Sequence, residues 1–444
     1  MDQSGSLSGV PQQELRHAIV ASSLPGEISG LSDGDLDDIT AFLIDAAARR
    51  APDTPLVHMR SRAGNSPEGR RILVAVINDD MPFLVDSIAH AITVEGIVIH
   101  RLLHPVVAVQ RNAAGVLDAI LPHGSAEGRP ESFVYLELDR ADARVRRRLE
   151  ARLLAVLGEI RAAVEDWPAM QAALAADADS LPDDEGAALL RWFLDRSFTQ
   201  LGHQFEALDG TVSEAAGILK VDPAPLWSAD ERAAAAAWLA QGNDPPLIAK
   251  SQRKARVHRH VPLDLLVVPR REGDRITGLS VHAGLWTSTA LRAPAQAIPV
   301  LRRRLDAIEE KYGFDPQGHA GKALTHAVTA LQRDLLIAMD DESLEAVALT
   351  AMSLADRPRP SIAVTRSPLA RHLHAFVWLP RDEWSTARRH AITDMICKAS
   401  DAPLLSWAMD LDDSGIILIR LTIDIRDGGG LPDVAALNRD LEAM

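Results

Sequence analysis

Residues 71–110 read RILVAVINDDMPFLVDSIAHAITVEGIVIHRLLHPVVAVQ. The β-branched run at 73–77 predicts a buried strand, which an acidic turn then ends. Asp80 can cap a following helix by accepting backbone N–H bonds. Apolar residues over 84–92 recur every three to four positions, which is typical of a helix with one buried face, and Gly96 ends it. The stretch therefore predicts a strand followed by an amphipathic helix.

A second strand begins at Ile97 and continues past Pro105 to Val109. Strand, turn, helix, glycine and strand form the first half of a βαββαβ unit. This order resembles the ACT domain, a small regulatory fold whose usual turn reads Asp-Arg-Pro-Gly-Leu. Here residues 80–84 read DMPFL, with Phe83 in place of the glycine that lets an amino-acid ligand approach the backbone in that family. The resemblance implies an ACT-like fold, while Phe83 argues against amino-acid binding by this unit.

The composition is that of a globular protein with sizeable cores. The chain has 444 residues, 47% of them hydrophobic, which is enough for about two to four domains. No apolar run approaches the ~18 residues of a transmembrane helix, and residues 1–30 lack a basic start followed by an apolar core, so we expect neither a membrane partner nor a secretory signal. The single cysteine, Cys397, excludes internal disulfides and fits a reducing cytoplasm, and we expect it to be a buried helical thiol.

The charge of the chain excludes one class of partner. Its net charge is −15, whereas nucleic acids and anionic membranes are bound through a basic footprint. Short basic runs do occur at 144–148, 253–260 and 302–304. Where such runs fall on helices, they are more typical of a solvated face than of a binding patch. We therefore predict no nucleic-acid partner.

The first part of the chain divides into two predicted segments. Residues 1–60 comprise a mobile N-terminus, over 1–30, and a helix that Ser32 and Asp35 can begin as capping-box partners. Residues 61–168 form the ACT-like domain. In it, an alternating strand at 131–138 is expected to have one solvated face, and a striped helix at 145–164 completes a two-layer α/β sandwich.

The remaining segments are separated by a linker rich in Asp and Ala. Residues 185–312 predict an antiparallel α+β module, with a glycine bulge in the strand at 198–208 and a hairpin around Glu272-Gly273-Asp274. Residues 313–335 form a helical connector. Residues 336–444 predict a second ACT-like domain of four strands and a helix at 382–399, capped by Asp382 or Ser385. Its strands are predicted at 362–365, 373–379, 404–409 and 416–425, with a turn at 412–415 between the last two.

Several segments resemble, in collinear order over about residues 35–440, the N-terminal region of the large bacterial NAD-specific glutamate dehydrogenases. They are INDDMPFLVDS (77–87), ESFVYLELDR (131–140), LLRWFLDRSFTQLGHQFEAL (189–208), GLWTSTAL (284–291) with IPVLRRRL (298–305), GFDPQGHAGKAL (313–324) and VWLPRDEWSTARR (377–389). The resemblance implies tandem two-layer α/β sandwiches, of the ACT-like βαββαβ type, flanking an antiparallel α+β sensor-like (PAS-type) module. The whole fold class is α+β.

The same resemblance implies that the catalytic core lies elsewhere. In that family, a further ACT-like unit and the dehydrogenase core follow this region. A dinucleotide site needs a Gly-rich turn between a strand and a helix, and the chain contains no G-x-G-x-x-G; the turn at 318–323 lacks the spacing of a phosphate loop. We therefore expect no catalytic residue and no cofactor in this segment, with NAD bound by the full-length enzyme.

One candidate ligand turn follows from the motif. Asn78, Asp79, Asp80, Phe83 and Ser87 form a polar cluster that can hold an effector's amino group or a cation. The competing interpretation is helix capping and a solvated helix start, since metal sites usually add further oxygen ligands at regular spacing.

The histidine pairs at 100/104, 258/260 and 372/374 do not predict a metal site. Zinc would need two more ligands for each pair, and neither a nearby cysteine nor an HExxH pattern supplies them. No Ser-His-Asp grouping is evident from spacing, and no G-x-S-x-G occurs. We expect these histidines to be ordinary surface or half-buried side chains.

The sequence thus favours a regulatory and oligomerisation segment of an NAD-dependent glutamate dehydrogenase. Its expected partners are further copies of itself, the downstream catalytic domain and a small amino-acid effector. The alternative is a stand-alone amino-acid-binding sensor of ACT type. A complete enzyme is a third hypothesis, which predicts glutamate-dependent NADH formation by the purified chain.

Overall fold

The computed structural model describes residues 10–62, 70–122, 125, 127–182, 184–243, 246–355, 357–411 and 415–444. Most of the predicted turn at 412–415 lies outside these ranges. The described chain divides into two compact units, of which the first comprises residues up to Trp167 together with 217–223 and 254–261. The second contains the rest. No described helix is both long and apolar enough to cross a membrane.

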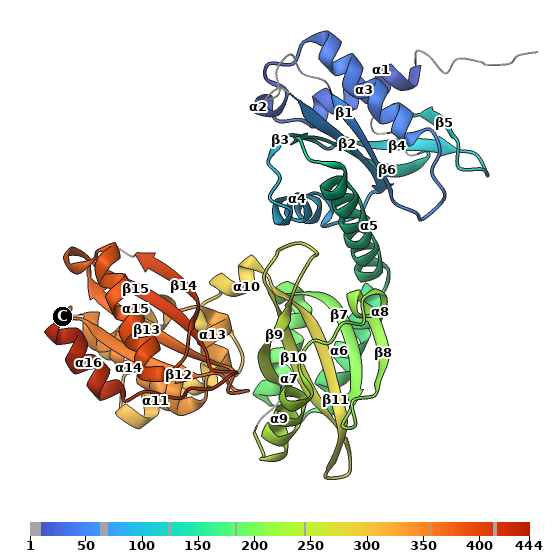
Figure 1. The fold of residues 1–444 in the computed structure, drawn as a ribbon. Helices are drawn as coiled ribbons and strands as arrows, with labels where there is room; N and C mark the ends of the chain where they lie inside the picture. Colours follow the sequence, from blue (N-terminus) through green and yellow to red (C-terminus); the bar gives the residue numbers. More distant parts are fainter. Residues whose placement is uncertain are drawn as a thin grey trace, which may run out of the picture. The chain divides into compact units, whose positions relative to one another are not determined.

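The first unit is built on one antiparallel sheet, in which β2 and β6 are central (Figure 1). The strand order is β1-β2-β6-β4-β5, and β3 pairs with β6 beyond the end of β4. The strands are β1 (Leu56–Arg62), β2 (Arg71–Asp79), β3 (Ile99–Leu103), β4 (Val106–Arg111), β5 (Leu117–Ile120) and β6 (Arg129–Asp139). The predicted strands at 73–77 and 131–138 are confirmed, and the long strand from Ile97 is split by Pro105 into β3 and β4.

Helices cover both faces of this sheet. Leu73, Ala75 and Ile77 share a core with α1 (Val10–Ser22) and α3 (Asp33–Ala47). On the opposite face lie α4 (Leu84–Val94) and α5 (Ala143–Glu165). The predicted two-layer sandwich is therefore wrong for this unit, which has three layers. For the same reason β6 has no solvated face, and its Glu131 and Ser132 are fully buried.

The N-terminal segment is the cause of the third layer. We expected residues 1–30 to be mobile, but α1 and the short helix α2 (Pro25–Ile28) are formed, and Leu15 and Ile19 are fully buried. Burial of these side chains against the sheet stabilises a segment whose Gly- and Ser-rich start suggested mobility. The capping box of Ser32 and Asp35 is confirmed at the start of α3.

The second unit contains two antiparallel sheets. The first has the order β8-β7-β11-β10-β9, with β7 (Phe198–Ala207), β8 (Val212–Gly217), β9 (Leu247–Lys254), β10 (Pro262–Glu272) and β11 (Arg275–Trp286). The predicted hairpin joins β10 to β11. The predicted bulge is also confirmed, because Gly202 and Gln200 pair with consecutive residues of β11 and leave Leu201 extra. Helices α6 (Trp167–Ser180) and α7 (Glu185–Trp192) precede β7 in sequence, and α8 (Ile218–Val221) and α9 (Ala229–Ala240) lie between β8 and β9.

The second sheet of this unit has the order β12-β13-β15-β14. Its strands are β12 (Ser361–Arg366), β13 (His372–Pro380), β14 (Leu404–Leu411) and β15 (Ile416–Asp424), packed with α14 (Asp341–Ala355), α15 (Thr386–Ser400) and α16 (Val434–Ala443). Four predicted strands and the predicted helix are confirmed, and Ser385 is the residue that caps α15. Helices α10 (Ser288–Arg292), α11 (Leu301–Tyr312), α12 (His319–Thr329) and α13 (Arg333–Ala338) connect the two sheets.

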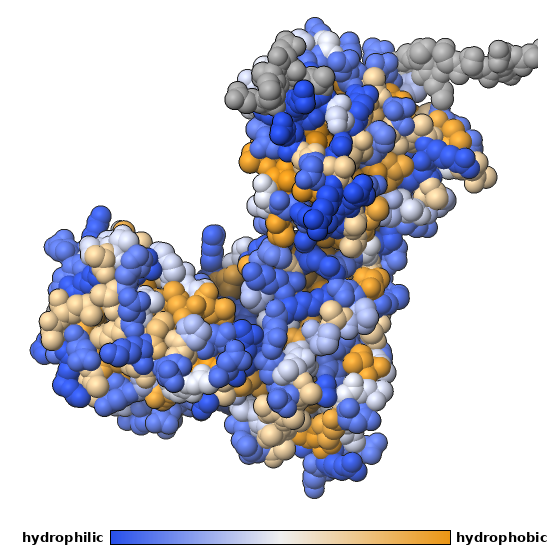
Figure 2. All heavy atoms as spheres, viewed as in Figure 1, coloured by the Kyte–Doolittle hydropathy of each residue, from blue (hydrophilic) through white to orange (hydrophobic). Residues whose placement is uncertain are grey.

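One hydrophobic core runs through this second unit. It includes Phe193 and Trp286 near the first sheet, Leu336 of α13, and Phe376 of the second sheet. Apolar side chains also remain at the surface, and Figure 2 shows them interspersed with hydrophilic residues on the face in view. The described chain as a whole is a mixed α/β protein with antiparallel sheets.

Candidate functional site

The ACT-like turn lies between β2 and α4. Helix α4 begins at Leu84, and the residue before it, Phe83, has φ +72° and makes no capping bond with its side chain. The prediction that Asp80 caps this helix is therefore wrong. Because a right-handed helix cannot include a residue in the left-handed region, the helix begins only after Phe83. The Asp80 carboxylate instead accepts a hydrogen bond of 2.7 Å from the Ser132 hydroxyl.

Asn78 and Asp79 are held inside the domain. Asp79 accepts hydrogen bonds from Arg50 at 2.7 Å and from Arg161 at 2.5 Å. Arg161 also donates to the Asn78 amide oxygen at 3.1 Å. Burial alone would raise the pKa of Asp79, but these two guanidinium groups outweigh it and lower the pKa. Both side chains thus anchor β2 to its neighbours.

Glu131 completes this network from the adjacent strand. It accepts a hydrogen bond of 2.7 Å from Arg50 and two of 2.8 Å from Arg111. The side chains of Arg50 and Glu131 are 2% and 1% exposed. A buried cation and a buried anion that satisfy each other in this way belong to the structure of the domain, since either one alone would be costly to bury.

Phe83 and Ser87 meet a segment from far along the chain, residues 254–261, which we call the strap. The Ser87 hydroxyl donates to the Phe83 carbonyl at 2.6 Å and accepts from the His258 backbone N–H at 2.8 Å. The His258 ring lies 5.3 Å from the Phe83 ring. The strap is anchored further by Arg256, which forms ion pairs with Glu159 and Asp222. The polar groups of the predicted effector turn are therefore engaged within the chain.

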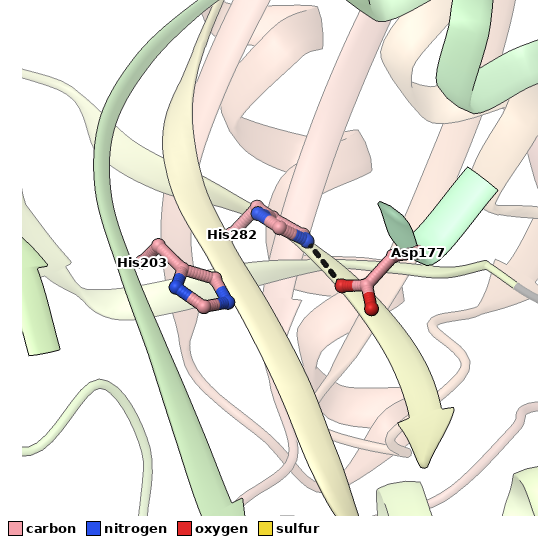
Figure 3. A group of neighbouring side chains, drawn as sticks. All are labelled: Asp177, His203 and His282. Carbon is pink, nitrogen blue, oxygen red and sulfur yellow. Dashed lines mark hydrogen bonds and ion pairs between the residues drawn. The ribbon is translucent and has the colours of Figure 1, made fainter. Parts of the chain in front are cut away.

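A second cluster, which the sequence analysis did not find, lies in the first sheet of the second unit. Asp177 of α6, His203 of β7 and His282 of β11 come together, as Figure 3 shows, with ligand atoms within 4.8 Å of one another. They are 6%, 3% and 0% exposed. The two imidazole rings are stacked with centroids 4.6 Å apart.

The hydrogen bonds of this cluster define its proton positions. Ser280 donates its only hydroxyl proton to Asp177, so the Nε2 of His203, 3.0 Å from the Ser280 oxygen, is a donor. His282 donates from Nε2 to Asp177 over 2.7 Å. Its Nδ1 accepts from the Gln200 amide nitrogen at 2.9 Å. His282 thus donates to the Asp177 carboxylate directly, and His203 donates to the Ser280 hydroxyl, which in turn donates to the same carboxylate.

The pKa values agree with this arrangement. Burial, helped by the neighbouring His282, lowers the pKa of His203 to about 4. Burial would raise the pKa of Asp177, but its hydrogen bond and charge interaction with His282 outweigh burial and lower the pKa. A neutral His203 beside an ionised Asp177 is therefore the expected state near pH 7.

Two imidazoles and a carboxylate are also a donor set used for zinc or iron(II). Among the described residues, this is the one group of three or more such side chains that comes close enough together to hold an ion. A metal would have to replace the Nε2 protons of both histidines. The His282 Nδ1 would then carry a proton and need an acceptor, whereas here it faces the donor amide nitrogen of Gln200. The observed hydrogen bonds satisfy the cluster without an ion, so we assign it a structural role.

The histidine pairs of the sequence analysis are spread over other contacts. His100 lies 2.7 Å from Asp139, and His104 lies 2.9 Å from the Ser132 hydroxyl. The rings of His372 and His374 are 6.3 Å apart, and burial lowers the pKa of each to about 4. The spacing of His372 and His374 along β13 could have indicated that they share one face of the strand. It could not have indicated which residues pack against that face.

Three domain models, each described as part of glutamate dehydrogenase, match the chain. They are the ACT1 domain over residues 17–153, helical motif 1 over 298–357 and the ACT2 domain over 362–444. The ACT1 match includes α3 and the C-terminal part of α1, which lie outside the domain bounds predicted from the sequence. The ACT2 match covers the second sheet of the second unit.

Relatives with the name NAD-specific glutamate dehydrogenase are similar over most of the chain. The protein of Halomonas elongata is 29% identical over 388 residues, which cover 81% of this chain and 24% of the relative. That of Pseudomonas aeruginosa is 31% identical over 357 residues, 74% of this chain and 22% of the relative. That of Mycobacterium tuberculosis is 24% identical over 393 residues, which cover 84% of this chain and 23% of the relative. The matched part of the chain spans about a quarter of each relative's length.

Proposed function

Because this chain belongs to the large NAD-specific glutamate dehydrogenase family, as an N-terminal region with ACT and helical-motif domains, we propose that it is a regulatory and assembly segment of such an enzyme. The match of three glutamate dehydrogenase domains in collinear order carries the proposal. The whole enzyme would oxidise L-glutamate with NAD and water to 2-oxoglutarate, ammonia and NADH in the cytoplasm. Its catalytic core and NAD site would lie outside this chain.

The module at 185–312 is proposed to be PAS-type. Numbered within the module, its five antiparallel strands follow the order second, first, fifth, fourth, third, and this single sheet with its flanking helices supports the proposal. The other predicted boundaries, 1–60, 61–168, 313–335 and 336–444, stay part of this proposal. In this scheme an ACT-like domain lies on each side of the PAS-type module in sequence.

The edge strand β14 supports a role in assembly. Its side chains Leu405, Trp407, Met409 and Leu411 alternate along one face and are 51%, 45%, 40% and 52% exposed. An exposed apolar edge strand presents unpaired backbone groups and is a natural site for pairing with another chain. A second copy of the same strand, or a further ACT-like unit of the enzyme, would cover it.

Deletion in the full-length enzyme tests the regulatory role. Removal of residues 1–444 should change the oligomeric state, measured by sedimentation, and the response of glutamate-dependent NADH formation to amino-acid effectors. The proposal is wrong if both properties are unchanged. For the edge strand, Trp407→Lys should shift the assembly toward smaller species, whereas Leu431→Lys, at a residue that is 58% exposed outside β14, should not.

The stand-alone sensor is the second candidate. It requires the natural polypeptide to be close to the 48.1 kDa of this chain, which a denaturing gel with an antibody to this segment can measure in the source cells. A band several times larger supports the dehydrogenase segment. A band at the mass of the chain favours the sensor.

A further inference from the structure

A pocket in the second unit lies among elements that are distant in sequence. Its walls come from β9 and β10, from α13, and from β12, β13 and the turn between them. The cavity has a volume of about 50 Å³, which is room for the polar head of a small ligand. It does not include the ACT-like turns that follow β2 and β13.

Charged side chains form one side of the pocket. Lys250 of β9 lies 2.5 Å from the Asp264 carboxylate and 2.7 Å from that of Asp334. Asp264 and Asp334 are 5% and 12% exposed at their side chains, while Lys250 keeps 37% of its side-chain surface accessible. Lys250 therefore retains a donor position that its two carboxylate partners do not use.

Two buried polar atoms in this pocket have no partner. The Asp334 Oδ1 and the Thr365 hydroxyl oxygen make no hydrogen bond to any described residue, and both residues line the pocket. Thr365 is 3% exposed. An unsatisfied buried polar atom is costly and needs an explanation. Here the two lie in one small space, so a single polar ligand can satisfy both.

Two neutral histidines add further hydrogen-bonding capacity. His372 and His374 also line the pocket, and neither ring is hydrogen-bonded to a described residue. Burial keeps both uncharged near neutral pH, with pKa values of about 4. A neutral imidazole offers one donor and one acceptor. The polar side of the pocket thus presents donors for an anionic group and an acceptor for a cationic one.

Part of the pocket wall is apolar. Its aliphatic surface comes from Ile248, Leu335, Ala338, Met339 and Leu369. The Arg371 guanidinium, which donates to the Lys250 carbonyl and pairs with Glu231, links β13 to β9 and α9 beside the pocket. A ligand that matches this site has a small zwitterionic head and an aliphatic tail.

We propose that this pocket binds a small aliphatic α-amino acid. The Asp334 Oδ1 accepts from the α-ammonium group, while the free position of Lys250 and the Thr365 hydroxyl donate to the α-carboxylate. The aliphatic tail lies on the apolar wall. As an effector site this inference rests on the proposed regulatory function, whereas binding by the chain itself can be tested without it.

The test is isothermal titration of the purified chain with L-alanine, L-valine and L-leucine, each in a separate experiment, at pH 7. At least one should bind with a stoichiometry of one per chain. Asp334→Asn should weaken binding at least about tenfold, since a charge-assisted hydrogen bond is lost. Thr365→Val should weaken it about two- to twelvefold. The control Thr277→Val removes a hydroxyl from β11 that bonds to the Arg270 carbonyl outside the pocket, and should leave the affinity unchanged.

Thermal unfolding without ligand makes the test independent of folding defects. Because the Thr365 hydroxyl has no partner among the described residues, Thr365→Val should leave the melting temperature unchanged or raised while affinity falls. The inference is overturned if none of the three amino acids binds, or if one binds equally well to Thr365→Val and Asp334→Asn. If no amino acid binds, but removal of residues 1–444 still changes the assembly or regulation of the full-length enzyme, this site is rejected and the proposed function is retained.

Discussion

Acidification should destabilise the second unit through its buried histidines. His203, His372 and His374 each have a pKa lowered from 6.5 to about 4, first of all by burial. Besides burial, the neighbouring His282 and Arg270 disfavour the charged form of His203, whereas Asp177 and Glu214 favour it without outweighing burial. In each case the folded state holds the neutral imidazole.

The sign and the size of this destabilisation follow from proton linkage. In the unfolded chain these histidines take up a proton near pH 6.5, whereas the folded chain resists protonation until about pH 4. The stability they contribute is therefore complete above pH 6.5 and is lost as the pH falls from 6.5 toward 4. At pH 5, which is about 1.5 units below the pKa of histidine in the unfolded chain, the loss of stability is about 2 kcal/mol for each histidine.

A comparison of the wild type with one histidine variant at two pH values separates the effect of that histidine from all other titrating groups. We would measure the free energy of unfolding by urea, followed by tryptophan fluorescence, at pH 7.0 and pH 5.0 for the wild type and for His203→Gln. Glutamine can still donate to the Ser280 hydroxyl, which lies 3.0 Å from the His203 Nε2. The wild type should lose about 2 kcal/mol more than the variant on acidification.

The control is His390→Gln, at an exposed histidine of α15, which should lose as much stability as the wild type. The reasoning is refuted if His203→Gln also loses as much as the wild type between the two pH values. That result would mean that His203 is already protonated in the folded protein at pH 5, or that the unfolded chain also holds it neutral.

Three further predictions concern the first unit and use urea unfolding at pH 7. Glu131→Gln leaves the buried Arg50 with a weaker partner and should lower the free energy of unfolding by about 3–5 kcal/mol. Glu345→Gln, at the exposed pair with Lys311, should lower it by less than about 1 kcal/mol, and equal losses would contradict the buried network. Phe83→Gly should be more stable than Phe83→Ala by about 1 kcal/mol, because φ is +72° there, and the reverse order would argue against this backbone. Gly115→Ala should be strongly destabilising, since its Cβ would lie 2.2 Å from the Arg50 carbonyl oxygen; a change within about 0.5 kcal/mol would exclude that close approach.

The sequence alone determined the elements that depend on local pattern. Apolar residues with a period near 3.6 predicted α4 and α5, and the β-branched run at 73–77 predicted β2, because burial of one face requires that spacing whatever the partner is. Turn residues placed the β10–β11 hairpin. The same local patterns carried the resemblance to glutamate dehydrogenase, which the domain matches confirmed.

Tertiary structure decided what surrounds these elements. Asp177 and His282 are 105 residues apart, and Ser87 and the strap residue His258 are 171 apart. No local periodicity relates such positions; they meet only because sheet register and helix packing bring their elements together. The third layer of the first unit arises likewise, since a helix pattern shows that a face is buried but not against which sheet. The sequence therefore determined which segments fold, and long-range packing determined which side chains share a site.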